Sequence, residues 1–305
     1  MNYIKWKIEE IKKYVSNSKP EIQTSDVVKL SVEKITSDTY AGETTYTGEQ
    51  FILLDIYPTT NGTVSITYGG LTKTITDTSG VEEPNAQRVF FGTFNGVSDS
   101  VETPLSGELV IEGDYVAFGC SKYNKESKDI VDNYCLCVTD IQSFGKVLRI
   151  PDRAFSNGVG GCVLTSIEIP NSVTSIGYEA FFRCINLVNV LIPEGVTNIG
   201  HNAFCGCPYE NIEIPKSVIS IGAHAFNTMD PMMINPPTLK TVNVLAKTPP
   251  ELLSNSDTEY INFSFGNLTD EGCVLEQITV PKGCSDVYKN ATGWSYYADY
   301  IVEVS

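Results

Sequence analysis

The sequence lacks the features that would assign it to a common catalytic or membrane class. No run of 18 apolar residues occurs, so the sequence predicts no membrane-spanning helix. Only two histidines are present, His201 and His224, and neither has a sequence context that suggests a catalytic base beside a nucleophile. Motifs of α/β-hydrolases, P-loop proteins, zinc proteases and dinucleotide-binding folds are also absent. The sequence therefore predicts a protein that is not an enzyme and that binds no cofactor.

Positive charge is scarce. The chain has 21 Lys and Arg against 37 Asp and Glu, and the resulting net charge of −16 is spread over both halves. An acidic surface repels phosphate backbones, so nucleic acid is not an expected partner. A protein or a cell-surface glycan is the partner that we expect instead.

The N-terminal sequence MNYIKWKIEEIKKYV has charges every few residues and lacks the apolar core of a secretory signal. Two expectations follow. The protein is either a component of a phage virion, which lysis releases without a signal, or a bacterial surface or secreted protein whose signal has been removed.

Residues 164–229 contain three copies of one pattern. The copies read LTSIEIPNSVTSIGYEAFFRC, LVNVLIPEGVTNIGHNAFCGC and YENIEIPKSVISIGAHAFNTM, with a period of 22 or 23 residues. This period and the L-x-x-I-x-I spacing are typical of leucine-rich repeats. In each copy the alternation of apolar and polar residues predicts a strand with one buried face, which a proline ends. The segment V-x-x-I-G predicts a second short strand, with glycine at a sharp turn.

The A-F pair of each copy predicts a turn whose phenylalanine points inward and stacks on that of the next copy, so that the coils form a solenoid. Strands of the same spacing follow at Leu239–Val244 and Leu275–Val280. Upstream, Leu148, Ile150 and Pro151, followed by Ala154 and Phe155, look like a shortened first coil. The solenoid is therefore expected to run from about Val147 to the end of the chain.

This repeat resembles the BspA-like leucine-rich repeat family of bacterial and protist surface proteins. The segments KTPP (247–250) and ITVPKGCSDVYKNATGWSYYADYI (278–301) are similar to segments of gut-bacterial members. The resemblance covers the C-terminal half only. It implies a parallel-strand solenoid with a non-catalytic binding or adhesion role, and it transfers no catalytic residue.

The nine cysteines do not have the spacing of a disulfide framework. Cys184 and Cys207 occupy one repeat position, which Met229 fills in the third copy, so we predict buried free thiols. Cys135 and Cys137 lack the spacer and the second half of a zinc site, so no metal site is predicted.

The N-terminal half has a different pattern. The residues Ile4, Ile8, Ile11 and Val15 follow a 4-3-4 spacing that predicts an amphipathic helix. A helix this short has only marginal stability by itself in water, so it must dock on another surface. That surface is either its own chain or a partner in an assembly, and both alternatives are open. Between 27 and 123, runs of Val, Ile, Thr, Phe and Tyr separated by turn signals predict a small immunoglobulin-like sandwich, with a hairpin at Gly69-Gly70.

Two irregular stretches, 230–238 and 251–272, interrupt the solenoid and either decorate it or carry contacts. In the second stretch, the alternation of Ile261, Phe263 and Phe265 predicts a strand packed on the coils.

The candidate binding residues point outward from the repeat strands in rows, a surface with which repeat proteins bind large partners, although simple hydration of this face is the alternative. They are Ser166, Glu168, Asn189, Leu191, Asn211, Glu213, Thr241 and Asn243. Glu168 and Glu213 would lie roughly 10 Å apart, a spacing that an inverting glycosidase could use. Leu191 between them and the open face argue for a solvated acidic surface instead.

The sequence thus predicts a mixed, mostly β fold: an N-terminal amphipathic helix (1–20), an immunoglobulin-like β-sandwich (21–140) and a leucine-rich-repeat solenoid with a C-terminal cap (141–305). The predicted function is recognition, adhesion or structure, first as a phage virion surface or host-attachment component. A secreted bacterial surface adhesin is the alternative, and a carbohydrate-active enzyme is a third. Other virion proteins are expected to bind the helix or the sandwich, in an oligomer or a larger assembly.

Overall fold

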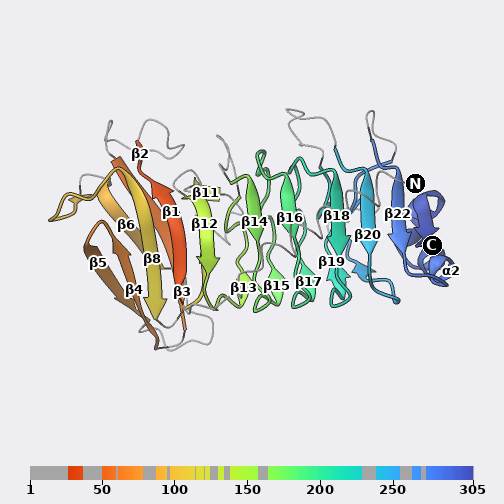
Figure 1. Cartoon of the computed structure of the whole chain (residues 1–305), viewed down its shortest axis with the longest axis horizontal. Coiled ribbons are helices and arrows are strands. Elements are labelled where there is room, and N and C mark those ends of the chain that lie inside the picture. The colour runs from red at the N-terminus through yellow and green to blue at the C-terminus, as the bar shows by residue number, and fades with distance from the viewer. Residues whose placement is uncertain are drawn as a thin grey trace, which may run out of the picture.

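The protein is elongated, with a unit of two antiparallel sheets followed by a solenoid of parallel strands (Figure 1). The predicted helix at 4–15, Cys135, Cys137, Met229 and Ile261 lie outside the residues that are described. The computed structural model describes residues 27–36, 50–59, 61–77, 87–94, 97–113, 115–119, 121–123, 130–133, 138–156, 164–228, 238–254, 263–268 and 273–304.

Two five-stranded sheets form the N-terminal unit. The first has the order β12-β1-β8-β4-β5, made of β12 (Val138–Phe144), β1 (Val28–Glu33), β8 (Ser106–Gly113), β4 (Thr63–Tyr68) and β5 (Leu71–Thr76). The second contains β2 (Ile35–Thr36), β3 (Gln50–Pro58), β6 (Gln87–Phe94), β7 (Val97–Ser98) and β9 (Tyr115–Gly119). A separate antiparallel pair is formed by β10 (Ser121–Tyr123) and β11 (Ile130–Asn133).

The predicted hairpin is confirmed, since β4 pairs with β5 through Gly69 and Gly70, whose φ angles of 56° and 83° suit a two-residue turn. Strands also occur between residues 121 and 142, and β12, which pairs with β1, spans the predicted domain boundary at 140. An immunoglobulin-like topology and the division into domains remain predictions.

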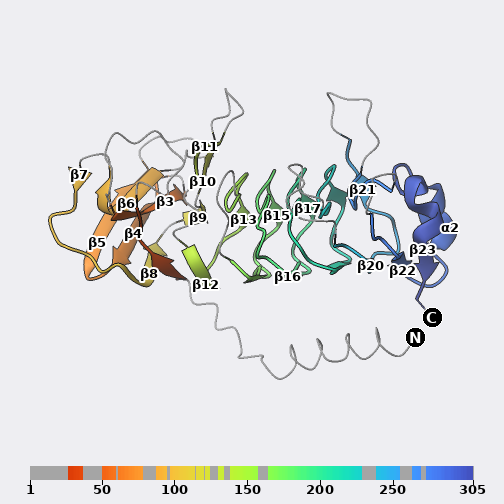
Figure 2. The same cartoon turned by 90° about the horizontal axis from the view of Figure 1, so that it is seen from above.

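The solenoid has two rows of parallel strands. One row is a five-stranded sheet of β13 (Arg149–Ile150), β15 (Ser175–Ile176), β17 (Asn198–Ile199), β19 (Ser220–Ile221) and β21 (Glu251–Leu252). The other row is divided between two sheets, the first made of β14 (Ser166–Glu168) and β16 (Asn189–Leu191). The second contains β18 (Asn211–Ile214), β20 (Thr241–Val244), β22 (Gln277–Val280) and β23 (Ile301–Glu303). The two rows lie on different sides of the solenoid (Figure 2).

A column of five phenylalanines runs through the centre of the solenoid. Phe155, Phe181, Phe204, Phe226 and Phe265 are buried and stack with centroid distances of 5.2, 5.1, 5.7 and 5.8 Å and interplanar angles of 5–9°. Their backbone amides connect the same coils, because each of the first four donates to a carbonyl of the next coil at 2.7–2.8 Å. The predicted inward stacking of the A-F turns is confirmed.

The repeat glycines are required by the spacing between coils. A Cβ on Gly200 would lie 2.5 Å from the carbonyl carbon of Gly177, and one on Gly222 would lie 2.3 Å from the amide nitrogen of His201. Neither glycine has a positive φ. A turn does begin at each repeat glycine, since the amide of Ala203 donates to the Gly200 carbonyl at 3.3 Å. Close contact with the preceding coil, and not a positive φ, is the reason for glycine at this position.

The shortened first coil is confirmed, since β13 pairs in register with β15 and Phe155 stacks on Phe181. Ile150 and Pro151 take the places of Ile176 and Gly177, so this coil begins with the second strand of the repeat.

One local prediction is corrected. Phe263 and Phe265 lie in a turn and not in a strand. Phe265 nevertheless continues the phenylalanine column, since the Phe226 amide donates to the carbonyl of Ser264.

The cysteines of the coils are free. Cys184 and Cys207 are buried, and their thiols donate to the carbonyl oxygens of Phe155 and Phe181 at 3.2 and 3.1 Å. Each thiol therefore adds a bond to the coil before it. The prediction of buried free thiols at this repeat position is confirmed for both residues.

One core connects the two-sheet unit with the solenoid. Phe155 of the first coil contacts Phe118 of β9 and Phe144 of β12, with ring centroids 5.8 and 6.4 Å apart. Nearby, the Arg149 guanidinium lies 5.6 Å from the centroid of the Tyr57 ring, and burial, with the neighbouring Asp55, raises the pKa of Tyr57 to about 12. The phenylalanine column thus begins against the sheets.

At its other end the column meets the C-terminal cap, which contains α2 (Ser285–Asn290) and η2 (Trp294–Tyr300). The Trp294 ring lies 5.4 Å from Phe265, and its indole N–H donates to the Pro250 carbonyl at 2.7 Å. Glu303 of β23 accepts bonds from the backbone of Gly283 and from Ser285, and these bonds lower its pKa. The cap therefore closes the core with aromatic rings whose polar atoms are bonded.

Removing one ring from the column tests its contribution. We expect Phe204→Ala to lower the free energy of unfolding by about 3–5 kcal/mol, because it leaves a cavity between two stacked rings. Phe182→Ala, at a half-buried neighbour, should cost clearly less. Urea denaturation measures both, and a loss below about 1 kcal/mol for Phe204→Ala would show that the ring is not buried in this way.

Adding one methyl group tests the spacing of the coils. We expect Gly200→Ala to destabilise the protein by about 2–3 kcal/mol or more, because the Cβ overlaps the backbone of Gly177. Gly107→Ala is the matched control, since its Cβ would meet nothing closer than 3.6 Å, and it should change stability by about 1 kcal/mol or less. Equal effects of the two substitutions in thermal unfolding would contradict close coil contact.

Candidate functional site

The candidate site is the outward surface of β14, β16, β18, β20 and β22, which we call the strand face. Residues alternate between core and solvent along each strand, so that Ile167, Val190 and Ile212 are buried while their neighbours point outward. The first row contains Ser166, Asn189, Asn211, Thr241 and Gln277. The second row contains Glu168, Leu191, Glu213, Asn243 and Thr279.

The strand pairing places the eight predicted binding residues in these rows. Ser166 pairs with Asn189 and Glu168 with Leu191, in parallel register. Asn211 and Glu213 pair in the same way with Thr241 and Asn243. Paired strands lie about 4.8 Å apart, so each row repeats with this spacing within a sheet. That these residues bind a partner remains a prediction.

Two residues of the strand face, Gln277 and Thr279, were missed in the sequence. They pair with Thr241 and Asn243 and continue both rows. The signal was available, because Leu275, Ile278 and Val280 had already been assigned to the buried side of this strand. The two polar residues between them could have been assigned to the outward side.

The C-terminal part of the strand face is held by its own hydrogen bonds. Asn243 donates to Glu213 at 2.8 Å and accepts a bond from the Thr279 hydroxyl at 2.7 Å. In the first row, the Thr241 hydroxyl donates to Asn211 at 2.5 Å. These side chains are therefore fixed before any partner binds, which lowers the entropy lost on binding.

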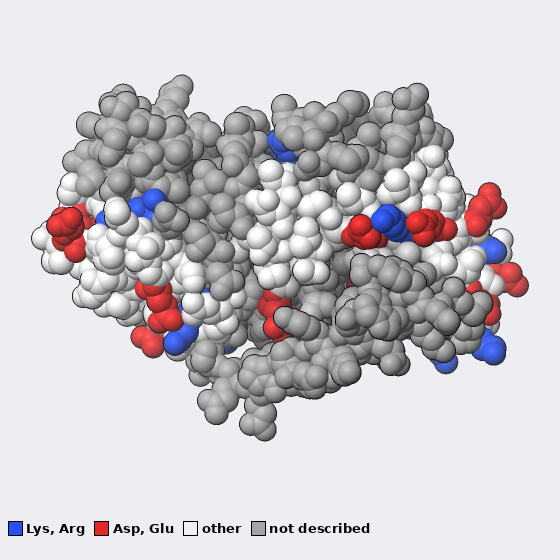
Figure 3. All heavy atoms as spheres, turned by 45° about the horizontal axis from the view of Figure 1, so that its top comes forward, with Lys and Arg blue, Asp and Glu red and all other residues white. Residues whose placement is uncertain are grey.

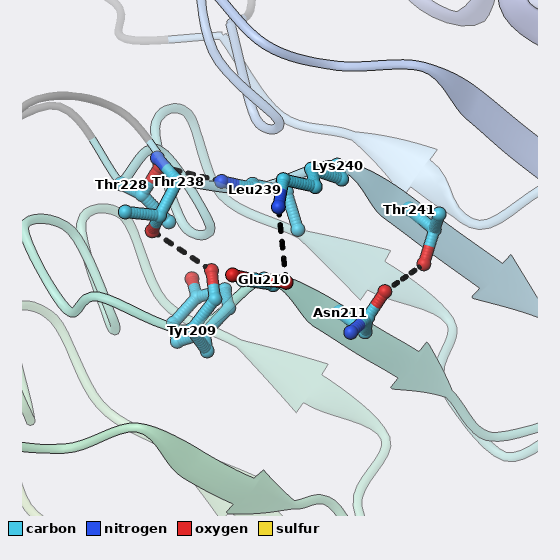
Figure 4. Close-up of polar contacts among 8 residues, drawn as sticks. All are labelled: Tyr209, Glu210, Asn211, Thr228, Thr238, Leu239, Lys240 and Thr241. Carbon is cyan, nitrogen blue, oxygen red and sulfur yellow. Dashed lines mark hydrogen bonds and ion pairs between the residues drawn. The ribbon is translucent and has the colours of Figure 1, made fainter. Parts of the chain in front are cut away.

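The ends of the loop between β19 and β20 are joined to each other by hydrogen bonds (Figure 4). The Thr228 hydroxyl accepts bonds from the amides of Thr238 and Leu239 at 2.8 and 3.1 Å. Beside the strand face, Lys240 and Glu210 form an ion pair at 3.1 Å. Acidic and basic side chains also lie close together over the C-terminal part of the solenoid, next to uncharged surface (Figure 3).

The N-terminal part of the strand face differs. Ser166, Glu168 and Asn189 form no side-chain hydrogen bond with the part of the chain that the structure describes. Val188, beside β16, and Leu191, on it, are 49% and 48% exposed. The N-terminal part of the strand face is therefore less polar than the C-terminal part, and fewer hydrogen bonds hold its side chains in place.

The two glutamates considered as a glycosidase pair lie on different sheets. Glu168 is on β14 and Glu213 on β18, and both are exposed. Leu191 lies in the row between them, and Glu213 accepts a bond from Asn243. Both carboxylates are open to solvent, whereas the general acid of a glycosidase lies in a pocket that excludes water.

The two histidines belong to the coil turns. Nδ1 of His201 accepts a hydrogen bond from the Ala223 amide at 2.9 Å, and burial lowers the pKa of His201. Asp152 accepts a bond from the Tyr178 amide at the equivalent place in an earlier coil, at 2.8 Å. His224 contacts the Phe263 ring at 5.8 Å. His201 thus has a structural role in joining coils.

Within the described ranges, no three His, Cys, Asp or Glu side chains are grouped so that they could hold a metal ion. Among those same residues, no helix has the length and apolar character needed to cross a bilayer.

Comparisons with known proteins give one family. Residues 148–268 match the model of the BspA type leucine-rich repeat region, in six copies. A leucine-rich repeat protein from Bacteroides ovatus ATCC 8483, solved by crystallography, aligns with 20% identity and a TM-score of 0.27 over 56% of this chain. The alignment spans 61% of that protein's length. None of the curated proteins compared with the chain matches it.

The histidine in the coil turn predicts a pH dependence. Because the folded state lowers the pKa of His201, the unfolded chain binds more protons, and the stability falls as the pH drops below the unfolded value of about 6.5. His201→Asn retains a hydrogen-bond acceptor for Ala223 without titrating in this range. We expect wild type to lose stability relative to His201→Asn between about pH 7 and pH 5 in urea denaturation. A stability difference that does not change with pH would contradict this role.

Proposed function

We propose that this chain, in which residues 148–268 belong to the BspA-like leucine-rich repeat family, is a non-catalytic recognition protein that binds a macromolecule through the strand face. The observation that carries this proposal is the register of the exposed rows, which aligns outward side chains from strand to strand within β14-β16 and within β18-β20-β22. Extended surfaces of this kind are how repeat proteins engage large partners.

The composition of the rows favours a polar partner. Asn211, Asn243 and Thr279 offer amide and hydroxyl groups, and Glu213 offers a carboxylate, on a surface that is open to solvent. Such groups hydrogen-bond to a protein surface or to the hydroxyls of a glycan. The acidic net charge of −16 disfavours a phosphate backbone.

The continuous core supports a role in surface display. Phe118 and Phe144 of the two-sheet unit contact Phe155 of the first coil, so the strand face is held rigidly relative to the sheets. We propose that the N-terminal part, including an immunoglobulin-like sandwich, is held by other proteins of a phage virion while the solenoid contacts the host. A bacterial cell-surface or secreted adhesin with the same arrangement is the alternative, and electron microscopy of purified particles labelled with an antibody distinguishes the two.

Two pairs of substitutions with equal changes in charge test the strand face. Thr241→Arg with Asn243→Arg adds two positive charges to β20. Asn198→Arg with Ile219→Arg adds two on the opposite sheet, where Asn198 is exposed and Ile219 is 64% exposed. We expect the first pair to lower adsorption of the purified full-length protein to intact host cells by about tenfold or more, and the second to leave it unchanged.

Two results would contradict the proposal. Equal losses for both pairs would indicate a general charge effect, and no loss for either would show that the strand face does not bind. Turnover of glycans that Glu168→Gln abolishes would instead favour an enzyme.

A further inference from the structure

The outward strands of the solenoid do not form one continuous sheet. β14 pairs with β16, and β18 pairs with β20, but β16 and β18 belong to different sheets. Among the described residues, no ladder of backbone hydrogen bonds joins β16 to β18. We call this interruption of the strand face the seam. On its two sides lie the N-terminal panel (β14 and β16) and the C-terminal panel (β18, β20 and β22).

The backbone bonds within the panels show which groups face the seam. The amide of Val188 donates to the carbonyl of Thr165 at 3.2 Å, so the even-numbered residues of β16 face β14. Likewise, the carbonyl of Ile214 accepts a bond from the amide of Leu245 at 3.0 Å, so the even-numbered residues of β18 face β20. The seam is therefore lined by the backbone groups of four exposed residues, which are Asn189, Leu191, Asn211 and Glu213.

The sequence gives a physical reason for the seam. Two residues separate Cys184 from Leu187, but only Pro208 separates Cys207 from Tyr209. The third copy of the repeat therefore enters its outward strand one residue early. Tyr209 is also larger than the leucine that the other copies have at this position, and its ring is buried. A shorter connection and a larger buried ring both keep β18 from pairing with β16.

The opposite side of the same two coils is continuous. There β17 pairs in register with β19, and the side chain of Asn198 donates to the Ser220 hydroxyl at 2.7 Å. In the core between these sides, the amide of Phe204 donates to the carbonyl of Ala225 at 2.8 Å, and the rings of Phe204 and Phe226 stack. The two coils are thus joined through the core and along β17 and β19, but not along the strand face.

Each panel beside the seam is held together by its own bonds. In the C-terminal panel, Asn243 donates to Glu213 and accepts a bond from Thr279. In the N-terminal panel, β14 and β16 pair in register through three residues each. Two parts that are ordered within themselves and joined along one side only have the arrangement of a hinge.

We propose that the seam is a hinge, at which the two panels of the strand face change their angle about the paired strands β17 and β19. The motion is confined to the strand-face side, because the bonds and stacked rings of the phenylalanine column stay in place. A partner that contacts both panels fixes one angle, and its polar groups reach the backbone groups that line the seam. The hinge stands without a partner, whereas this fixing of the angle rests on the proposed function.

Distances between spin labels on the full-length protein, measured by pulsed electron paramagnetic resonance without any partner, test the hinge. Labels on encoded p-acetylphenylalanine avoid the native cysteines. One pair, at Ser166 and Thr241, spans the seam from β14 to β20. The control pair, at Thr174 and Glu251, spans the same coils along the continuous opposite sheet. We expect the distance distribution of the first pair to be about twofold broader than that of the control.

A repaired variant makes the test independent of the label positions. One alanine inserted between Pro208 and Tyr209, together with Tyr209→Leu, restores the spacing and the residue type of the other copies. We expect this variant to narrow the distribution of the Ser166 and Thr241 pair to the width of the control.

Two results would overturn the hinge. These are equal widths for the two pairs in the native chain, and a broad distribution that the repair leaves unchanged. If the repaired variant does not fold, as judged by circular dichroism, the comparison of the two pairs in the native chain decides by itself. Because no partner is present, the result does not depend on whether the strand face adsorbs to cells, so the two proposals fail separately.

Discussion

The contact between successive coils is the constraint on which the rest of the solenoid depends. The backbone of each repeat glycine touches the coil before it so closely that a single added carbon would overlap, as at Gly200 against Gly177. At this spacing the phenylalanine rings stack nearly parallel, and the amide of Phe204 reaches the carbonyl of Ala225 in the next coil at 2.8 Å. Close contact, ring stacking and hydrogen bonding therefore require the same distance between coils.

The strand face follows from this spacing. Because every coil repeats its neighbour in register, outward residues such as Asn211 and Thr241 must lie side by side, whether or not they bind anything. The outward residues can therefore be substituted during evolution while the buried residues keep the fold. The corners of the coils show the same regularity, since Glu179, Asn202 and His224 hold equivalent positions and all have φ between 52° and 57°. Backbone strain of this kind persists only where surrounding contacts determine it.

Local pattern was sufficient to predict the repeating part of the structure and insufficient elsewhere. The period of 22 or 23 residues led to the stacking of Phe181, Phe204 and Phe226 and to the outward rows. Phe265 was not recognised as a member of the column because an insertion of irregular length separates it from Phe226 and no alanine precedes it. The pairing of β1 with β12, which are about 110 residues apart, has no local signal at all.

Native-state hydrogen exchange along the phenylalanine column is the most direct test of this account. The amides of Phe155, Phe181, Phe204 and Phe226 all bond to the next coil, and one continuous core joins them to Val28 and Ile111 of the two-sheet unit. If the coils are held together as described, these amides exchange with one common free energy of opening, equal to that of global unfolding. A free energy that decreases stepwise along the column, or differs between the coils and the sheets, would show that the coils open independently and would contradict the account.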